Sequence, residues 1–276
     1  MYEGKQVSVT DRNSGIAVLK VSNPPNGFMD DTTEKELVAA LDRIHSRSDI
    51  TVVVITGGQP GVFVQHYDTL VLEARARQMA AKGLKFDLSK PVPEVSIHRV
   101  LRQIEESACT YLAAINGTAM GAGYELALAC DLRIAQAGQY RIGLPEVNLG
   151  LVPGAGGTQR LTRLIGPARA LELMLLGDTL GPHEARSYGL VNDVVDEAVL
   201  PVALQLARAL VSRPARARAH IKQLVKQAAR GEVEAGYESE RTLFCDLMVN
   251  PQTHDRLQLL NNGQVDVHGQ DLPDAA

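Results

Sequence analysis

Two glutamates stand among glycines and apolar residues between positions 113 and 161, and they are the side chains here best suited to chemistry. Glu125 follows a Gly-Ala-Gly run, and Glu146 comes 21 residues later, directly after a proline. A carboxylate in apolar surroundings has a raised pKa, and a second carboxylate nearby raises it further. Such a pair can supply a general acid and a general base near neutral pH. Each glutamate taken singly has a simpler explanation, which is to cap or neutralise a helix N-terminus.

The small residues ahead of Glu125 could present backbone donors to a ligand. Residues 121–123 read Gly-Ala-Gly and open a segment with the pattern of an apolar helix. The first N–H groups of a helix have no partner inside the helix, and they carry the positive end of its dipole. Such donors suit an oxyanion that develops in a transition state. The glycines could equally serve close packing of a helix on a sheet, so both interpretations stay open.

A polar cluster, His66-Tyr67-Asp68, follows a short apolar run. A histidine there could carry a proton near neutral pH. The alternative is a loop histidine satisfied by the backbone or by Asp68. The glycine-rich run at 154–159 lacks the last glycine of a dinucleotide-binding fingerprint, and no P-loop, GxSxG or HExxH motif occurs. No Cys/His spacing predicts a metal site.

The composition disfavours several classes of function. With 32 acidic and 28 basic residues the net charge is −4, which gives no general attraction to a nucleic-acid backbone. One basic tract, 208–230, is interpreted as a solvated helical face, with a phosphate-binding patch as the alternative. The three cysteines are widely spaced, which is typical of reduced cysteines in a cytosolic protein. The N-terminus does not resemble a signal peptide. No apolar run approaches the ~20 residues that are needed to span a bilayer. We therefore expect a soluble cytoplasmic protein without a membrane or nucleic-acid partner.

Strands and helices alternate over the first two-thirds of the chain, which is typical of α/β architecture with a parallel sheet. Apolar or alternating runs predict strands at 6–11, 16–21, 51–56, 111–116, 132–135, 139–142 and 190–195, and a short strand entering a loop at 61–68. Helical patterns are found after a cap at Asp31 or Thr32, ending near residue 48, and at 95–106 and 123–129. An irregular helical excursion at 69–90 is interpreted as a lid or pocket wall.

The last third of the chain is predicted to be mainly helical, with helices at 157–165, 167–176, 182–188, 200–211, 215–229, 232–248 and 252–260. We therefore predict a core domain over residues 1–199 and a helical C-terminal region over residues 200–276. The polar tail after about residue 262 is expected to be frayed.

Three stretches of this sequence resemble the crotonase (enoyl-CoA hydratase/isomerase) superfamily. They are AAINGTAMGAGYELALACDLRIA, IGLPEVNLGLVPGAGGTQRLTRLIG and GLVNDVV, and the match is dense from residue 112 to 195. The resemblance implies an α/β fold built as a spiral of strand-strand-helix (ββα) units, with a C-terminal helical region used in trimerisation. It also implies a homotrimer or homohexamer, an acyl-CoA thioester substrate, and no cofactor beyond the coenzyme A of that substrate.

The resemblance also assigns residues to an active site. The thioester carbonyl would lie between the backbone N–H groups of Tyr67 and Ala122, and the catalytic acids would be Glu125 and Glu146. Further substrate contacts are expected from Gln65, His66, Asp68, Gly121 and Gly154. The family pattern at the first oxyanion donor is small-Gly-Ala-Asp, whereas this chain has Gln-His-Tyr-Asp at 65–68. Two bulky side chains there place the substrate class in question.

The resulting hypothesis is a lyase of fatty acid metabolism, an enoyl-CoA hydratase that adds water syn across the 2,3 double bond of a 2-enoyl-CoA. Isomerisation between 3-enoyl- and 2-enoyl-CoA, with Glu146 as the sole acid–base group, is the main alternative. Thioester hydrolysis or retro-aldol cleavage is also open, because His66 is available. RNA binding, known for some hydratase relatives, is disfavoured by the negative net charge.

Overall fold

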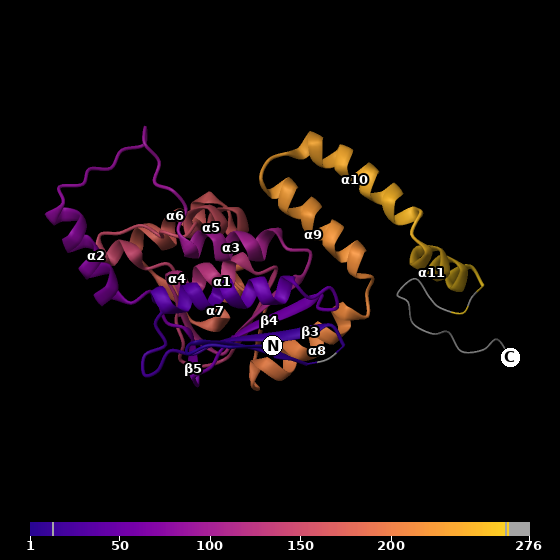
Figure 1. The fold of residues 1–276 in the computed structure, drawn as a ribbon, viewed down its shortest axis with the longest axis horizontal. Helices are drawn as coiled ribbons and strands as arrows, with labels where there is room; N and C mark the ends of the chain where they lie inside the picture. Colours follow the sequence, from indigo (N-terminus) through magenta and orange to yellow (C-terminus); the bar gives the residue numbers. More distant parts are fainter. Residues whose placement is uncertain (13, 263, 265–276) are drawn as a thin grey trace. The chain divides into compact units, whose positions relative to one another are not determined.

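The computed structural model describes residues 1–12, 14–262 and 264 (Figure 1). The chain divides into two compact units, residues 1–212 and 213–276. The boundary expected near residue 200 differs from this division by one helix, α8 (Val199–Val211), which belongs to the first unit. The frayed tail expected after residue 262 lies outside the described residues, apart from residue 264.

A seven-stranded sheet forms the centre of the first unit, in the order β1-β2-β3-β4-β6-β8-β11. The pairs at one edge, β1–β2 and β2–β3, are antiparallel, and all later pairs are parallel. The strands are β1 (Tyr2–Glu3), β2 (Val7–Asp11), β3 (Ile16–Val21), β4 (Val52–Gly57), β6 (Thr110–Ile115), β8 (Leu132–Gln136) and β11 (Asp193–Val195).

A second, four-stranded sheet has the order β10-β9-β7-β5, and its strands are β5 (Gly61–Val64), β7 (Gly117–Met120), β9 (Ile142–Gly143) and β10 (Thr179–Leu180). Successive turns of the chain contribute one strand to each sheet. Thus β4, β6 and β8 pair in parallel in the large sheet, while β5, β7 and β9 pair in parallel in the small one. The α/β spiral of ββα units is therefore confirmed.

Side chains of the central strands alternate between two apolar layers, as the two-residue period of a strand requires. In β4, Val53 and Ile55 pack into the layer on one face of the large sheet, whereas Val52 and Val54 pack into the other. The first layer is completed by α1 and α3, and the second by Val199 and other apolar residues of α8. Removing α8 would expose a whole face of the sheet, which is why this helix belongs to the core.

The helices of the first unit are α1 (Asp31–His45), α2 (Thr69–Ala81), α3 (Ser96–Glu106), α4 (Ala122–Ala129), α5 (Gly157–Ile165), α6 (Pro167–Leu176), α7 (Pro182–Tyr188) and α8, with a 3₁₀ turn η1 (Glu146–Leu149). Asp30 caps α1, because its carboxylate accepts from the N–H groups of Thr32 and Thr33. The expected caps, Asp31 and Thr32, are therefore wrong by one or two residues.

Two further expectations need correction. The helix expected over 69–90 ends at Ala81, and residues 84–95 carry no helix or strand because two prolines and many exposed positions give the segment nothing to pack on. The strand expected at 139–142 is the short β9 at Ile142–Gly143. The small-sheet strand β7 was not expected, since its sequence GTAM has little strand propensity of its own.

The second unit consists of α9 (Ala215–Ala229), α10 (Val233–Met248) and α11 (Pro251–Asn261), so the three expected C-terminal helices are present. Arg216 of the basic tract forms an ion pair with Asp246 of α10. At least this arginine therefore joins two helices of the unit instead of facing a free anion.

Candidate active site

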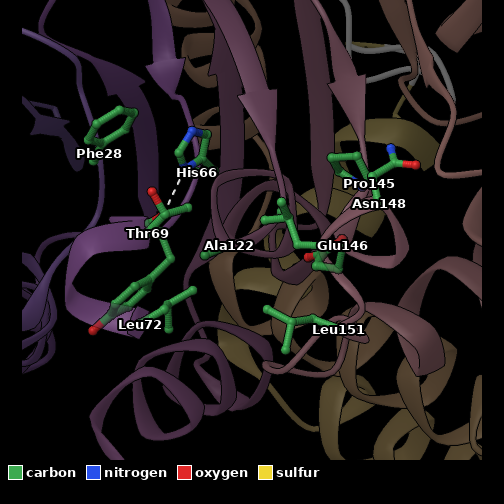
Figure 2. A pocket seen from close by; sticks show the side chains of 12 residues that line it. Phe28, His66, Thr69, Leu72, Ala122, Pro145, Glu146, Asn148 and Leu151 are labelled. Atoms are coloured by element: carbon green, nitrogen blue, oxygen red, sulfur yellow. Dashed lines mark hydrogen bonds between the residues drawn. The ribbon is translucent and has the colours of Figure 1, made fainter. Parts of the chain in front are cut away.

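A cavity of about 420 Å³ opens beside the start of α4 in the first unit (Figure 2). Most of its lining is apolar, and the residues come from the loop before α1, the loop between β5 and α2, the start of α2, the start of α4 and the η1 region. The lining residues are Phe28, His66, Tyr67, Thr69, Leu72, Gly121, Ala122, Pro145, Glu146, Asn148, Leu149 and Leu151. An apolar cavity with few polar groups is the usual form of a small-molecule site.

Ala122 presents a free backbone donor to this cavity. Its predecessor Gly121 has φ +51° and ψ −127°, a conformation that residues with a Cβ rarely adopt. The N–H of Gly121 donates to the Gly143 carbonyl, whereas Ala122 is the first residue of α4, where an N–H has no partner in the helix. Among the described residues no acceptor contacts the Ala122 N–H, so it can donate to a ligand.

The N–H of Tyr67 is freed in a different way. Met29 and Tyr67 form an isolated parallel bridge, in which Met29 N–H donates to His66 O (2.8 Å) and Asp68 N–H donates to Met29 O (2.8 Å). In a parallel bridge of this type, Met29 bonds to the backbone groups of the two neighbours of Tyr67, which are the His66 carbonyl and the Asp68 N–H. The N–H of Tyr67 itself therefore points away from Met29. Both N–H groups expected at an oxyanion hole therefore belong to residues that line one cavity.

Glu125 is fixed by a glycine-rich turn. Its side chain is 2% exposed, and Oε1 accepts from the N–H groups of Ala155 (2.8 Å) and Gly157 (2.7 Å). Burial raises the pKa of Glu125, and these two N–H donors oppose that shift because they favour the ionised form. A Cβ on Gly157 would stand 2.9 Å from Oε1, so only glycine leaves the carboxylate its place.

Glu146 has a contrasting environment. It begins η1 after Pro145 and lines the cavity, and its Oε2 is buried with no hydrogen-bond partner among the described residues. Burial and, to a smaller extent, the negative charge of Glu125 raise the pKa of Glu146 to about 7, although a hydrogen bond from its own backbone N–H opposes the rise. A Cβ on Gly121 would stand 3.2 Å from Glu146 Oε1, which places this carboxyl against the start of α4.

The two carboxyl groups are therefore tuned differently. The Glu125 carboxylate accepts from the N–H groups of two other residues, whereas Glu146 has only its own backbone N–H to stabilise its charge, and its Oε2 has no partner among the described residues. Pairs of carboxyl groups whose surroundings separate their pKa values are typical of acid–base catalysis. The two N–H donors favour the ionised form of Glu125, which a base requires, and a pKa of about 7 lets Glu146 hold a proton near neutral pH.

The other residues expected at the site lie in several places. His66 lines the cavity, stacks on Phe28 with ring centroids 4.5 Å apart, and donates from Nδ1 to the Tyr67 carbonyl at 2.7 Å (Figure 2). Its ring is thus bonded to the backbone, as one of the two interpretations expected. Gln65 joins β7 through its carbonyl, which accepts from Met120 N–H. Asp68 caps α2 and is not part of the cavity lining.

Gly154 also lies outside the lining, and its carbonyl accepts a hydrogen bond from His98 Nε2 at 3.0 Å. The Tyr67 side chain points to a separate network. Its hydroxyl donates to Asp31 (2.9 Å), and Arg75 of α2 donates to that hydroxyl and to Asp31. This network joins the first turn of α1 to α2, the wall of the cavity.

Several residues of the site were not expected from sequence. Phe28, Leu72, Leu149 and Leu151 line the cavity, although as single apolar residues they carry no chemical signature. The two donors to Glu125 were missed because backbone N–H groups have no signature except the glycines around them. The glycine-rich run at 154–157 was the available signal, because residues without a side chain leave their backbone N–H groups accessible to a neighbouring acceptor.

The sequence model of the enoyl-CoA hydratase/isomerase family matches residues 11–258. The chain belongs to this family. Among curated proteins, this family member is similar to the fatty acid oxidation complex subunit alpha of Shewanella amazonensis, with 37% identity over 214 residues. The match covers 74% of this chain and 28% of that relative, so the chain spans less than a third of the relative's length.

Solved structures agree with the family assignment. An enoyl-CoA hydratase from Bacillus anthracis superposes with a TM-score of 0.82 and 27% identity, covering 94% of this chain and 96% of that one. Pseudomonas aeruginosa DspI superposes with a TM-score of 0.78 and 30% identity, covering 90% and 98%. The resemblance to the crotonase superfamily is thus confirmed for this family member, together with its fold.

Two kinds of feature are absent from the part of the chain that the structure describes. No three His, Cys, Asp or Glu side chains there are grouped so that they could hold a metal ion. No helix in the same residues is long and apolar enough to cross a bilayer.

Proposed function

We propose that the chain is an enoyl-CoA hydratase, a hydro-lyase acting on a 2-enoyl-CoA. The observation that carries the proposal is the pair of glutamates in contrasting environments, one anchored by two N–H groups and one with a pKa of about 7, next to two free N–H donors. The name of the Bacillus anthracis structure and the family description support the same activity.

In the proposed mechanism, the thioester oxygen accepts hydrogen bonds from the N–H groups of Tyr67 and Ala122. These donors stabilise the enolate that forms when water adds to C3. Glu125 takes a proton from the attacking water, and the new bond joins the water oxygen to C3. The π electrons of the double bond move toward the carbonyl, and C2 then takes a proton from Glu146. A proton then passes from Glu125 to Glu146 and restores the site, so the sum is syn addition of one water, with no co-reactant.

The acyl group is proposed to be apolar. Phe28, Leu72, Leu149 and Leu151 offer it apolar contact, and among the described residues that line the cavity none is a lysine or an arginine. A carboxylate on the acyl chain would have to be desolvated without a fixed cation beside it, which is costly. A role in fatty acid oxidation is proposed on the same basis, supported by the name of the curated relative.

One observation favours isomerisation as a second candidate. Glu146 lines the cavity, whereas Glu125 does not. If Glu125 has no access to substrate, Glu146 alone could move a proton between C2 and C4.

Incubation of the pure protein with 2-enoyl-CoA and 3-enoyl-CoA, separately, tests the two candidates. Hydration is expected to give a product 18 Da heavier from the 2-enoyl-CoA, visible by mass spectrometry. Conversion of the 3-enoyl-CoA to its 2-isomer without added water would instead identify the isomerase. Release of free coenzyme A from either substrate would contradict both and indicate thioester hydrolysis.

The pH dependence of kcat/KM separates the candidates independently. Hydration needs Glu146 protonated and Glu125 ionised, so kcat/KM is expected to fall as pH rises through about 7, the pKa of Glu146. An isomerase that uses ionised Glu146 as its base shows the opposite sign, a rise through about 7. A profile that is flat from pH 6 to 9 would contradict both assignments of Glu146.

We also propose a homotrimer or homohexamer. Leu171, Leu175 and Leu176 are exposed together on α6, and a cluster of exposed leucines is typical of a surface that another chain covers. Analytical ultracentrifugation that finds only the 29.8 kDa single chain would contradict this.

A further inference from the structure

The turn formed by residues 154–157 decides where the Glu125 carboxylate lies. Both donors to Oε1, the N–H groups of Ala155 and Gly157, belong to this turn. Three of its four residues are glycines, and Gly156 has φ +91°. Glycine gives the backbone more freedom than any other residue. A turn of this composition therefore needs outside contacts to hold its two donors in place.

Arg160 supplies the strongest of these contacts. It lies on α5, just after the turn, and its Nη1 donates to the Ala155 carbonyl at 2.6 Å. Ala155 thus donates to Glu125 through its N–H and accepts from Arg160 through its oxygen. A Cβ on Gly156 would stand 2.6 Å from Arg160 Nη1, so the glycine is what lets the guanidinium reach the turn.

The Arg160 guanidinium is held in turn by a residue of α3. Arg160 Nη2 pairs with Glu105 Oε2 of α3 at 2.8 Å, and the two side chains are only 14% and 17% exposed. His98, also on α3, forms a second anchor. Its Nδ1 accepts from Val95 N–H, so Nε2 carries the hydrogen and donates to the Gly154 carbonyl. Helix α3 therefore holds the turn at two successive carbonyls.

The charge of Arg160 acts on Glu125 as well. It lowers the pKa of Glu125, as does His98 when protonated, and both oppose the rise caused by burial. Arg160 thus has two effects that point the same way, since it fixes the donors to the carboxylate and favours the ionised form that a base requires.

We propose that Arg160 is a positioning residue for Glu125, acting through the Ala155 peptide and held by Glu105. The inference rests on the proposed function, because Glu125 matters to turnover only if it handles the attacking water. A purely structural ion pair between α3 and α5 would stabilise the fold without a bond to the residue that binds Glu125.

The test compares Arg160→Met, Arg160→Lys and Arg163→Met. Arg163 lies on the same helix, is exposed, and serves as the control for loss of an α5 arginine. Arg160→Met is expected to lower kcat for hydration by about 10²-fold, the cost of misplacing a catalytic group by about 1 Å, with little change in KM. Arg160→Lys keeps the charge but loses the two-armed geometry, so an intermediate loss of kcat is expected. Arg163→Met should behave as wild type.

A second readout does not depend on turnover. In free protein labelled with ¹³C at the glutamate carboxyls, Glu125→Gln identifies the Glu125 signal by NMR. Its titration is expected to move to higher pH in Arg160→Met and to stay near the wild-type position in Arg160→Lys and Arg163→Met. If wild-type protein hydrates no enoyl-CoA, the proposed function fails, and this titration still shows whether Arg160 controls Glu125.

A folded Arg160→Met protein with kcat within twofold of wild type and an unshifted Glu125 signal would overturn the proposal. If Arg160→Met does not fold, Arg160→Lys decides, because it keeps the packing stem of the side chain. Wild-type kcat in folded Arg160→Lys would then count against positioning by the guanidinium.

Discussion

Replacement of Glu146 by Gln is expected to lower kcat for hydration of crotonyl-CoA by about 10²- to 10⁴-fold, the range of general acid–base catalysis. Gln keeps the shape of the side chain but has no proton to give to C2. The carboxyl lines the cavity, and its Oε2 has no hydrogen bond among the described residues, so the amide can occupy the same space. Steady-state kinetics with the purified variant measure the effect.

The melting temperature of Glu146→Gln shows whether the variant is folded. The pKa of Glu146 is raised to about 7 by burial, so its contribution to stability is fully present below its unfolded pKa and is lost as pH rises through about 7. Gln cannot ionise and avoids that loss. Glu146→Gln is therefore expected to melt at a higher temperature than wild type at pH 8, with a smaller difference at pH 5. Near-normal turnover in a folded Glu146→Gln protein would exclude Glu146 as the proton donor.

The second large effect is expected from Ala122→Pro, which removes one backbone donor without changing a catalytic side chain. Ala122 is the first residue of α4, a position where proline is well tolerated because the N–H has no helical partner. The proline ring would place a methylene where the N–H now faces the cavity. Loss of one oxyanion donor costs about 10²- to 10³-fold in kcat, and we expect a decrease of that size.

Ala122→Gly is the matched variant, since it changes the side chain and keeps the N–H. It is expected to retain most of the wild-type kcat, while both variants keep a cooperative thermal transition. Equal kcat values for the proline and glycine variants would show that the Ala122 N–H does not contact the thioester in the transition state.

Local patterns were enough to place most of the elements that build the site. The run at 51–56 has four consecutive apolar residues between two threonines, and in β4 these four are buried on both faces of the large sheet, as such a run predicts. The glycine run before Glu125 marked the start of α4 because residues with a Cβ rarely adopt the conformation of Gly121. The small strands β7, β9 and β10 were misplaced or missed, since two to four residues pair only when the neighbouring strand is present.

Sequence alone predicted the family, which the comparisons confirm, and it predicted the two glutamates and the two N–H donors of the site, because each is tied to a short motif. Only the tertiary structure decided how the glutamates differ. The 154–157 turn, held through Arg160, gives Glu125 two donors, whereas Oε2 of Glu146 has no hydrogen-bond partner among the described residues. The pKa of a carboxyl group depends on the groups that surround it in space, and those come from segments far apart along the chain. For the same reason, the bulky residues at 66 and 67 acquired their partners, the Tyr67 carbonyl and Asp31, only in the folded chain.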